Sequence, residues 1–168
     1  MSHSYFDSPI GPLLLTGDAT ALTGLYLAEH VRIATPRGNR DDAAFAEPVR
    51  QLTEYFAGDR QAFELPIAPA GTPFQLRVWQ LLQGIGYGER RTYGELAAEL
   101  GNPNAARAVG LANGRNPISI IVPCHRVVGS SGALTGYAGG LTNKQWLLDF
   151  ETRLLGGRPA ATGTAVPA

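Results

Sequence analysis

A stretch rich in proline and alanine over residues 66–71 divides this chain into two parts with different residue patterns. Before it, short apolar runs alternate with turn-forming residues, which is typical of strands. After it, apolar residues recur at helical spacing behind capping sequences. We therefore predict an α+β protein with an N-terminal α/β domain over residues 1–72, a mostly helical C-terminal domain over residues 73–156, and a flexible tail over residues 157–168.

The N-terminal part predicts a small antiparallel sheet with one helix. Its apolar runs are separated by Asp, Gly and Thr, so neighbouring strands are expected to pair through tight turns. Apolar positions at helical spacing, closed by Gly58, predict the helix. The expected strands cover residues 5–6, 12–18, 21–27 and 63–65, an exposed loop covers 29–42, and the helix covers 44–57.

Two capping sequences mark helix starts in the C-terminal part. Thr72 stands three residues before Gln75, and Thr92 stands three residues before Glu95, which is the spacing of a capping box. Gly-Asn-Pro at 101–103 ends the second helix, and another helix is expected over 104–113. Two short helices about a tight turn predict a winged helix-turn-helix domain, although an ordinary helical corner in a core has the same pattern.

The helix expected over 104–113 is made largely of small residues. They are Ala105, Ala106, Ala108, Gly110 and Ala112. The minor groove of DNA is about 6 Å wide, against about 12 Å for the major groove. A helix this thin is a candidate for the minor groove, where little base sequence is read; close packing against another helix is the alternative reading.

Charge is distributed unevenly although the net charge is zero. Residues 1–73 hold five Arg and nine acidic residues, whereas residues 74–168 hold eight Arg and Lys144 against five acidic residues. Such asymmetry favours an anionic partner for the C-terminal part. With so few charges, a chance partition is the alternative.

The cysteine and histidine content restricts cofactors and compartment. One cysteine and three histidines offer neither an internal disulfide nor a zinc-binding spacing, so we expect no metal. No apolar run approaches the roughly 20 residues of a membrane span, and the polar N-terminus is unlike a signal peptide. We expect a cytoplasmic protein with no membrane partner.

The lone cysteine follows an apolar run. Ser119–Val122 is β-branched and apolar, which predicts a strand buried on both faces, and Pro123 would end its pairing. Cys124 would then stand where a rigid element stops, with His125 as the first candidate base for its thiol. Side chains of adjacent extended residues point to opposite faces, so an ordered water is expected between them. The alternative is an inert buried cysteine.

The residues around this cysteine resemble a known family. The run Asn-Pro-Ile-Ser-Ile-Ile-Val-Pro-Cys-His-Arg-Val-Val over 116–128 is similar to the active-site signature of the O6-alkylguanine-DNA alkyltransferases. The resemblance spans about the C-terminal half, including Tyr93 and segments 105–110, 131–132, 136–140 and 146–148. The N-terminal half shares only length, strand pattern and the opening Ser-Pro-Ile-Gly at 8–11.

The resemblance implies a fold, an activity and a catalytic set. Its N-terminal domain would be ribonuclease H-like. The protein would flip O6-alkylguanine out of duplex DNA through the minor groove and transfer the alkyl group irreversibly to its own cysteine. The implied catalytic residues are Cys124, His125 as base, Glu151 as the acid that orients it, and Tyr93 as proton donor to the base.

The resemblance also implies DNA-binding residues. Arg107 would take the place of the flipped base, and Asn116 would bridge the recognition helix and the cysteine loop. Further implied or candidate contacts to the base or backbone are Ala106, Arg115, Val127, Tyr137 and Ala138. Arg126 is predicted to be structural, paired with backbone or an acid.

A thioether is not reversed by thiol exchange, so each protein molecule would transfer one alkyl group, and no cofactor would be needed. The protein is expected to be a monomer, and cooperative binding to DNA stays open.

Three other functions are compatible with parts of this sequence. A cysteine hydrolase would use the same thiolate but needs an oxyanion hole. A recognition module that binds alkylated guanine without repairing it would not need Cys124. A helix-turn-helix regulator would read DNA sequence, which a minor-groove helix disfavours.

Overall fold

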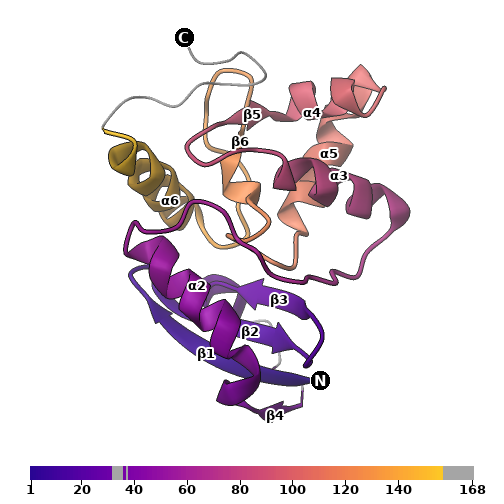
Figure 1. Ribbon diagram of the computed structural model, residues 1–168. Helices are drawn as coiled ribbons and strands as arrows, with labels where there is room; N and C mark the ends of the chain where they lie inside the picture. Colours follow the sequence, from indigo (N-terminus) through magenta and orange to yellow (C-terminus); the bar gives the residue numbers. More distant parts are fainter. Residues whose placement is uncertain (32–35, 37, 157–168) are drawn as a thin grey trace. The chain divides into compact units, whose positions relative to one another are not determined.

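The computed structural model describes residues 1–31, 36 and 38–156, which form two compact units (Figure 1). The first unit comprises Met1–Ala70 and Pro117–Ile121; the second comprises Gly71–Asn116 and the residues from Val122 on. A small sheet characterises the first and helices characterise the second, which confirms the predicted α+β class. Among the described helices, none combines the length and apolar character needed to cross a bilayer. The predicted tail lies outside the described residues.

The first unit is built on a four-stranded sheet with strand order β3-β2-β1-β4. Strands β1 (Ser2–Ser8), β2 (Gly11–Gly17) and β3 (Leu22–Tyr26) form an antiparallel meander, as predicted. Strand β4 (Asn39–Arg40) pairs in parallel with the edge of β1. Two short turns therefore connect most of the sheet, as expected for strands separated by Gly, Asp and Thr.

The core of this unit lies between the sheet and its main helix. Helix α2 (Ala46–Phe56), preceded by the 3₁₀ turn η1 (Asp42–Phe45), runs along the sheet in Figure 1. It buries Leu52 and Tyr55 completely. On β2, the consecutive residues Leu13, Leu14 and Leu15 are all fully buried, so this central strand is covered on both faces.

Two expectations for the first unit need correction. The predicted exposed loop at 29–42 includes part of a short helix, α1 (Ala28–Val31), and strand β4; residues 32–35 and 37 lie outside the described part. The predicted strand at 63–65 is wrong, because its backbone pairs with a side chain instead. The Gln51 amide donates to the Glu64 carbonyl (3.1 Å) and accepts from the Glu64 N–H (2.9 Å). One buried amide thus replaces a neighbouring strand.

Residues Pro117–Ile121 come from the middle of the C-terminal sequence yet pack with the first unit. The Leu25 N–H donates to the Pro117 carbonyl (2.8 Å), and the Ser119 N–H donates to the Leu25 carbonyl (3.1 Å). Ile118 forms the corresponding isolated parallel bridge with Leu25. This segment therefore extends the pairing of β3 for one residue only.

In its described part, the second unit has four α-helices and a two-stranded sheet. The helices are α3 (Pro73–Gln83), α4 (Tyr93–Glu99), α5 (Ala106–Gly114) and α6 (Leu141–Leu154), and the strands are β5 (Arg91–Thr92) and β6 (Val127–Val128), which pair in parallel. Both predicted capping boxes are confirmed: Thr72 with Gln75 begins α3, and Thr92 with Glu95 begins α4.

Helices α4 and α5 lie side by side and form the predicted helix-turn-helix (Figure 1). Gly101 ends the first helix with φ of +84°, a conformation that a side chain would strain. The 3₁₀ turn η2 (Pro103–Ala105) then leads into α5. Trp79 of α3 fixes the far end of α5, because its indole N–H donates to the Ala112 carbonyl at 2.8 Å.

Candidate active site and nucleic-acid interface

The cysteine stands at the start of a 3₁₀ turn, η3 (Cys124–Arg126), and is 3% exposed. The predicted strand at Ser119–Val122 is wrong. These residues form tight turns, in which the Ile121 N–H donates to the Ser119 carbonyl and the Cys124 N–H donates to the Val122 carbonyl, both at 2.8 Å. Ile120 has φ of +72° and cannot continue a strand. The apolar run reflects burial, which turns and strands satisfy equally.

His125 is completely buried and is held by Glu151 of α6. Its Nε2 lies 2.9 Å from Glu151 Oε2. Because burial lowers the pKa of His125, the ring is neutral near pH 7. A carboxylate can only accept, so Nε2 carries the hydrogen and Nδ1 carries the lone pair. That Nδ1 is buried and has no hydrogen-bond partner among the described residues. The ring is therefore oriented as a base.

Glu151 accepts hydrogen bonds from the cysteine turn, through His125 and Arg126, and from the backbone at Gly88. Arg126 approaches it with a fork, Nε to Oε1 at 2.9 Å and Nη2 to Oε2 at 2.8 Å, and the Gly88 N–H donates at 3.3 Å. Burial alone would raise the pKa of Glu151, but the hydrogen bonds from His125 and Arg126 and the positive charge of Arg126 outweigh burial and hold that pKa well below its usual range. The predicted structural role of Arg126 is confirmed; its Nη1 also donates to the Ile85 carbonyl at 2.6 Å.

The carbonyl of Thr135 joins Tyr93 to Lys144. It accepts from the Tyr93 hydroxyl at 3.1 Å and from Lys144 Nζ at 2.9 Å. Burial lowers the pKa of Lys144 to about 8, and the negative charge of Cys124 partly opposes this shift, so the ammonium and the sulfur act on one another. Burial also raises the pKa of Tyr93, which keeps its phenol protonated at neutral pH. One loop carbonyl thus fixes two proton-bearing groups.

Two buried asparagines connect α5 to the cysteine turn. Asn116, just beyond the helix, donates from its side-chain amide to the Val122 carbonyl at 2.8 Å. Asn113, near the end of the helix, has its amide 3.4 Å from the Cys124 carbonyl. The amide of Asn116 has the position expected for a bridge between the recognition helix and the cysteine loop. Asn113 adds a second link that the sequence did not suggest.

Helix α5 borders an open cleft of about 530 Å³ in the second unit. Three residues expected to act on DNA or its base line it, namely Tyr93, Ala106 and Arg107. The other lining residues are Gly94, Gly110, Leu111, Ser130, Thr135 and Gly136. The cleft therefore lies between the helix-turn-helix and the Gly-rich loop.

The remaining expected DNA-binding residues are spread around this cleft. Arg115 is exposed just after α5, and Ala138 is exposed on the Gly-rich loop. Tyr137 of the same loop is buried. Val127 is fully buried on β6, where its strand pairs with β5. These four residues do not line the cleft, so their expected roles rest on the sequence resemblance alone.

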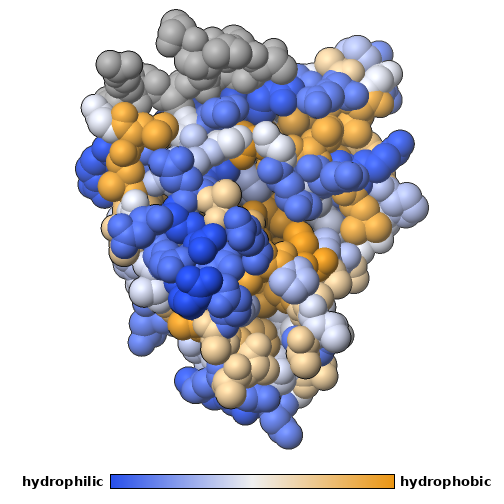
Figure 2. All heavy atoms as spheres, in the orientation of Figure 1, coloured by the Kyte–Doolittle hydropathy of each residue, from blue (hydrophilic) through white to orange (hydrophobic). Residues whose placement is uncertain are grey.

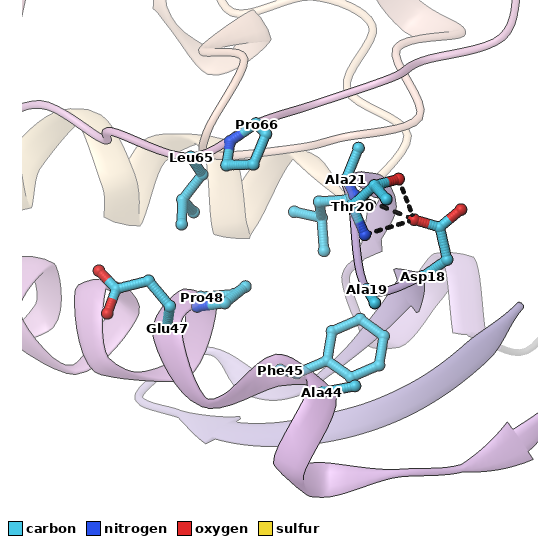
Figure 3. Close-up of a pocket in the computed structure, with 11 residues that line it drawn as sticks. Asp18, Ala19, Thr20, Ala21, Ala44, Phe45, Glu47, Pro48, Leu65 and Pro66 are labelled. Carbon is cyan, nitrogen blue, oxygen red and sulfur yellow. Dashed lines mark hydrogen bonds between the residues drawn. The ribbon is translucent and has the colours of Figure 1, made fainter.

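The first unit has a smaller pocket of about 230 Å³ that offers no comparable chemistry (Figure 3). Its carboxylates serve the protein itself. Asp18 accepts from the Thr20 hydroxyl and from the Thr20 and Ala21 N–H groups, and Glu47 is bonded to Arg50 and Gln51. The other walls are largely apolar. The groups that could react therefore lie in the second unit.

Sequence reasoning missed Lys144. The sequence does contain a hint, because Lys144 is the chain's single lysine, whereas the other thirteen basic residues are arginines. Only a lysine can be buried and lose its charge near neutral pH, whereas arginine stays protonated. A lone lysine in an arginine-rich chain therefore indicated a position where an ammonium was specifically needed.

Comparison with known proteins gives consistent results over both units. The model of the 6-O-methylguanine DNA methyltransferase DNA-binding domain matches residues 73–153, and that of the ribonuclease-like domain of the same proteins matches residues 1–69. The methylated-DNA–protein-cysteine methyltransferase of Methanosarcina acetivorans is 52% identical over 90% of this chain and 98% of that protein. The protein of the same name from Mycobacterium leprae is 54% identical over 86% of this chain and 88% of its own length.

A solved structure agrees with these relatives. The crystal structure of Mycobacterium tuberculosis OGT in complex with DNA superposes with a TM-score of 0.86 at 51% identity, covering 92% of this chain and 94% of the other. The resemblance stated from the sequence is confirmed by the whole-length matches. The similarity to this family also covers the first unit, whose sequence alone did not identify a family.

Proposed function

This chain belongs to the 6-O-methylguanine DNA methyltransferase family, whose work is alkyl transfer in DNA repair, and on that basis we propose that it repairs O6-alkylguanine at Cys124. The sulfur attacks the alkyl carbon, the S–C bond forms, and the bond from that carbon to the guanine O6 breaks. Guanine leaves with the electron pair and must gain a proton. The thioether stays on the protein, so each molecule acts once and needs no cofactor.

The arrangement of His125 supports this proposal most directly. Its neutral ring is locked by Glu151, and its buried Nδ1 lone pair has no partner among the described residues. Such a lone pair accepts the thiol proton of Cys124, either directly or through the ordered water that the sequence suggested. The proton is transferred within the interior, which leaves a thiolate where the alkyl group is to arrive.

Tyr93 is proposed to supply the proton that guanine needs. Its phenol lines the cleft beside α5 and remains protonated at neutral pH. In the structure this hydroxyl donates to the Thr135 carbonyl. When a base enters, the phenol would turn its hydrogen to the base nitrogen, and Lys144 would remain on the carbonyl. Once the proton held by His125 has returned to Tyr93, the net result is that the thiol proton is replaced by an alkyl group and guanine leaves neutral.

The exposed side of α5 is proposed to meet the minor groove. Arg107 would occupy the place of the flipped nucleotide, whose extrusion costs a few kcal/mol. Ala106 leaves room beside the groove wall, and Arg115 is a candidate phosphate contact. Asn116 would link this helix to the cysteine turn through the Val122 carbonyl, so that the helix that binds DNA and the cysteine that accepts the alkyl group keep a fixed relative position.

The base itself would be held by the cysteine turn and the Gly-rich loop. The carbonyls of Cys124 and Val127 are proposed to accept from the guanine amino group, which adenine lacks. Tyr137 would form a pocket wall, and the N–H of Ala138 would donate to O6. These contacts select guanine by its hydrogen-bonding edge.

Mass spectrometry tests the proposal. The protein is incubated with a duplex that contains O6-methylguanine, and its intact mass and peptides are measured. We expect a gain of one methylene on the Cys124 peptide that saturates at one per protein molecule. Cys124→Ala and an undamaged duplex are the controls, and both should give no gain. A gain on another residue, or several turnovers per molecule, would refute transfer to this cysteine.

A further inference from the structure

Helix α5 presents one exposed stripe to solvent. The exposed positions recur every three or four residues and are Asn104, Arg107, Ala108, Leu111 and Arg115. This spacing places them on one face, which begins in the turn before the helix and ends just beyond it. The opposite face, with Val109 and Ala112, is buried. The thin helix expected from the sequence thus has small residues on both faces, but one large apolar side chain points outward.

Leu111 is that outward side chain, and it is 66% exposed, more than any other leucine in the described part of the chain. Isolated exposed leucines are common and need no explanation. Leu111 is different because it lines the same cleft as Tyr93 and Arg107. Its position is therefore part of the surface to which the substrate is assigned, not of an unrelated face.

Two cations flank this leucine. Arg107 lies one turn before it and Arg115 one turn after it. Neither arginine forms an ion pair within residues 1–31 and 38–156, so both remain available to DNA, Arg115 to phosphates and Arg107 to the position of the flipped nucleotide. An apolar group between two such cations matches a minor groove, where deoxyribose edges lie between two rows of phosphates. A purely apolar protein surface would not explain the pair of flanking charges.

We propose that Leu111 is a specificity-determining DNA contact that inserts into the minor groove beside Arg107 and packs against deoxyribose and base edges. Apolar side chains inserted in this way partly unstack base steps and open the groove. The insertion lowers the cost of extruding the neighbouring nucleotide, and a damaged, weakly paired base gains most. This inference rests on the proposed function, since it requires that α5 meets duplex DNA.

The test measures duplex binding by fluorescence anisotropy over a series of salt concentrations. Leu111→Ala should lose roughly fivefold to tenfold in affinity, because most of the side chain's burial is lost. The slope of log affinity against log salt should stay unchanged, since no charge is removed. Arg115→Ala should instead reduce that slope by about one. Leu111→Met, which keeps the apolar volume, should bind within about twofold of the unchanged protein.

A second readout reports the groove opening itself. A 2-aminopurine placed next to the lesion brightens when its step unstacks, and Leu111→Ala should give a smaller rise at saturating protein. Leu154→Ala, an exposed leucine at the end of α6 that lies outside the cleft, is the matched control and should behave as the unchanged protein. Equal affinity and equal brightening for Leu111→Ala and the unchanged protein would overturn the inference.

Alkyl transfer separates this inference from the proposed function. Transfer rates are compared for a duplex and for a single-stranded oligonucleotide that carry the same lesion. For Leu111→Ala, the ratio of duplex to single-strand rates should fall roughly fivefold, because only the duplex has a groove to open. If the unchanged protein transfers nothing to Cys124 from either substrate, the proposed function fails. If it transfers and the ratio is unaffected by Leu111→Ala, only the insertion fails.

Discussion

Charged side chains serve opposite purposes in the two compact units. In the first unit, Arg50 bridges Glu47 and Glu54 along the outer face of α2, which appears as a hydrophilic patch in Figure 2. Within the described residues, no charged side chain of that unit is buried. In the second unit, Arg126, Lys144 and Glu151 are all buried around the cysteine turn. Charged side chains lie on the surface of the first unit, whereas in the second unit they also form a buried cluster around the cysteine turn.

This difference between the two units shows where charge interactions contribute to the stability of the fold. An exposed ion pair exchanges one polar environment for another and contributes little. A buried charge must keep every partner, because a missing one leaves an ion in a medium that solvates it poorly. The following changes test this contrast, beginning with the largest effect.

Arg126→Met should destabilise the second unit by about 3–5 kcal/mol. The change removes the fork on Glu151 and leaves a buried carboxylate with fewer donors. Urea unfolding followed by tryptophan fluorescence measures this, since Trp79 and Trp146 both lie in the second unit. Arg126→Lys, which keeps the charge but cannot form the fork, should lie between. A loss below about 1 kcal/mol would mean that the buried pair behaves like a surface pair.

Gln51→Leu should cost the first unit about 1–3 kcal/mol. The residue is buried and neutral, and its loss strands both the N–H and the carbonyl of Glu64. Faster hydrogen exchange in peptides that cover residues 47–66 would report the effect locally. Glu64→Ala is the control, because the contact uses only its backbone. If Gln51→Leu left exchange unchanged, neutral buried groups would not distinguish this unit from its charged neighbour.

The stability of the second unit should fall as pH drops below about 6.5. Burial lowers the pKa of folded His125, so the unfolded chain binds the proton first, and the stabilisation present above pH 6.5 is lost on acidification. The slope reaches at most about 1.4 kcal/mol per pH unit. His125→Gln should flatten it in tryptophan-detected unfolding. His30→Gln, in the first unit, should not, although burial lowers the pKa of His30 as well.

Arg50→Ala should leave the free energy of unfolding almost unchanged, because exposed ion pairs contribute little to stability. All three partners of this network lie on the surface of α2 and are screened by salt. Unfolding followed by far-UV circular dichroism at low and high salt measures this change, and we expect any small difference in stability to vanish at high salt. A clear loss of stability that did not depend on salt would show that the α2 network is structural and would weaken the contrast between the units.

Local sequence rules predicted much of this fold. Threonine caps, the Gly-Asn-Pro break and the alternating runs each act within a few residues, so the helix starts at Thr72 and Thr92 and the three-stranded meander followed from the sequence. The cysteine signature and His125 were likewise visible, because they are adjacent. Features that depend on distant residues were not visible in the same way.

Long-range partners explain the errors. The backbone at 63–65 is satisfied by Gln51, which no period or propensity reveals. Ile120 was assigned to a strand by its β-branched side chain, yet its backbone has φ of +72°. At Ile120, burial explains the apolar side chain, whereas the turn determines the backbone conformation. Lys144 was missed for the same reason, since its partner Thr135 is set by the loop conformation.

The buried ions around the cysteine turn carry a net positive charge when the sulfur is neutral. With His125 neutral, the buried charged groups in the described part of the second unit are two cations, Arg126 and Lys144, and one anion, Glu151. Arg126 neutralises Glu151, whereas the Lys144 ammonium rests on an uncharged carbonyl. The sulfur of Cys124 is the group whose negative charge favours that ammonium. This interior is therefore electrically balanced when the sulfur is ionised, and the proposed transfer would remove the counter-ion of Lys144 by converting the sulfur to a neutral thioether.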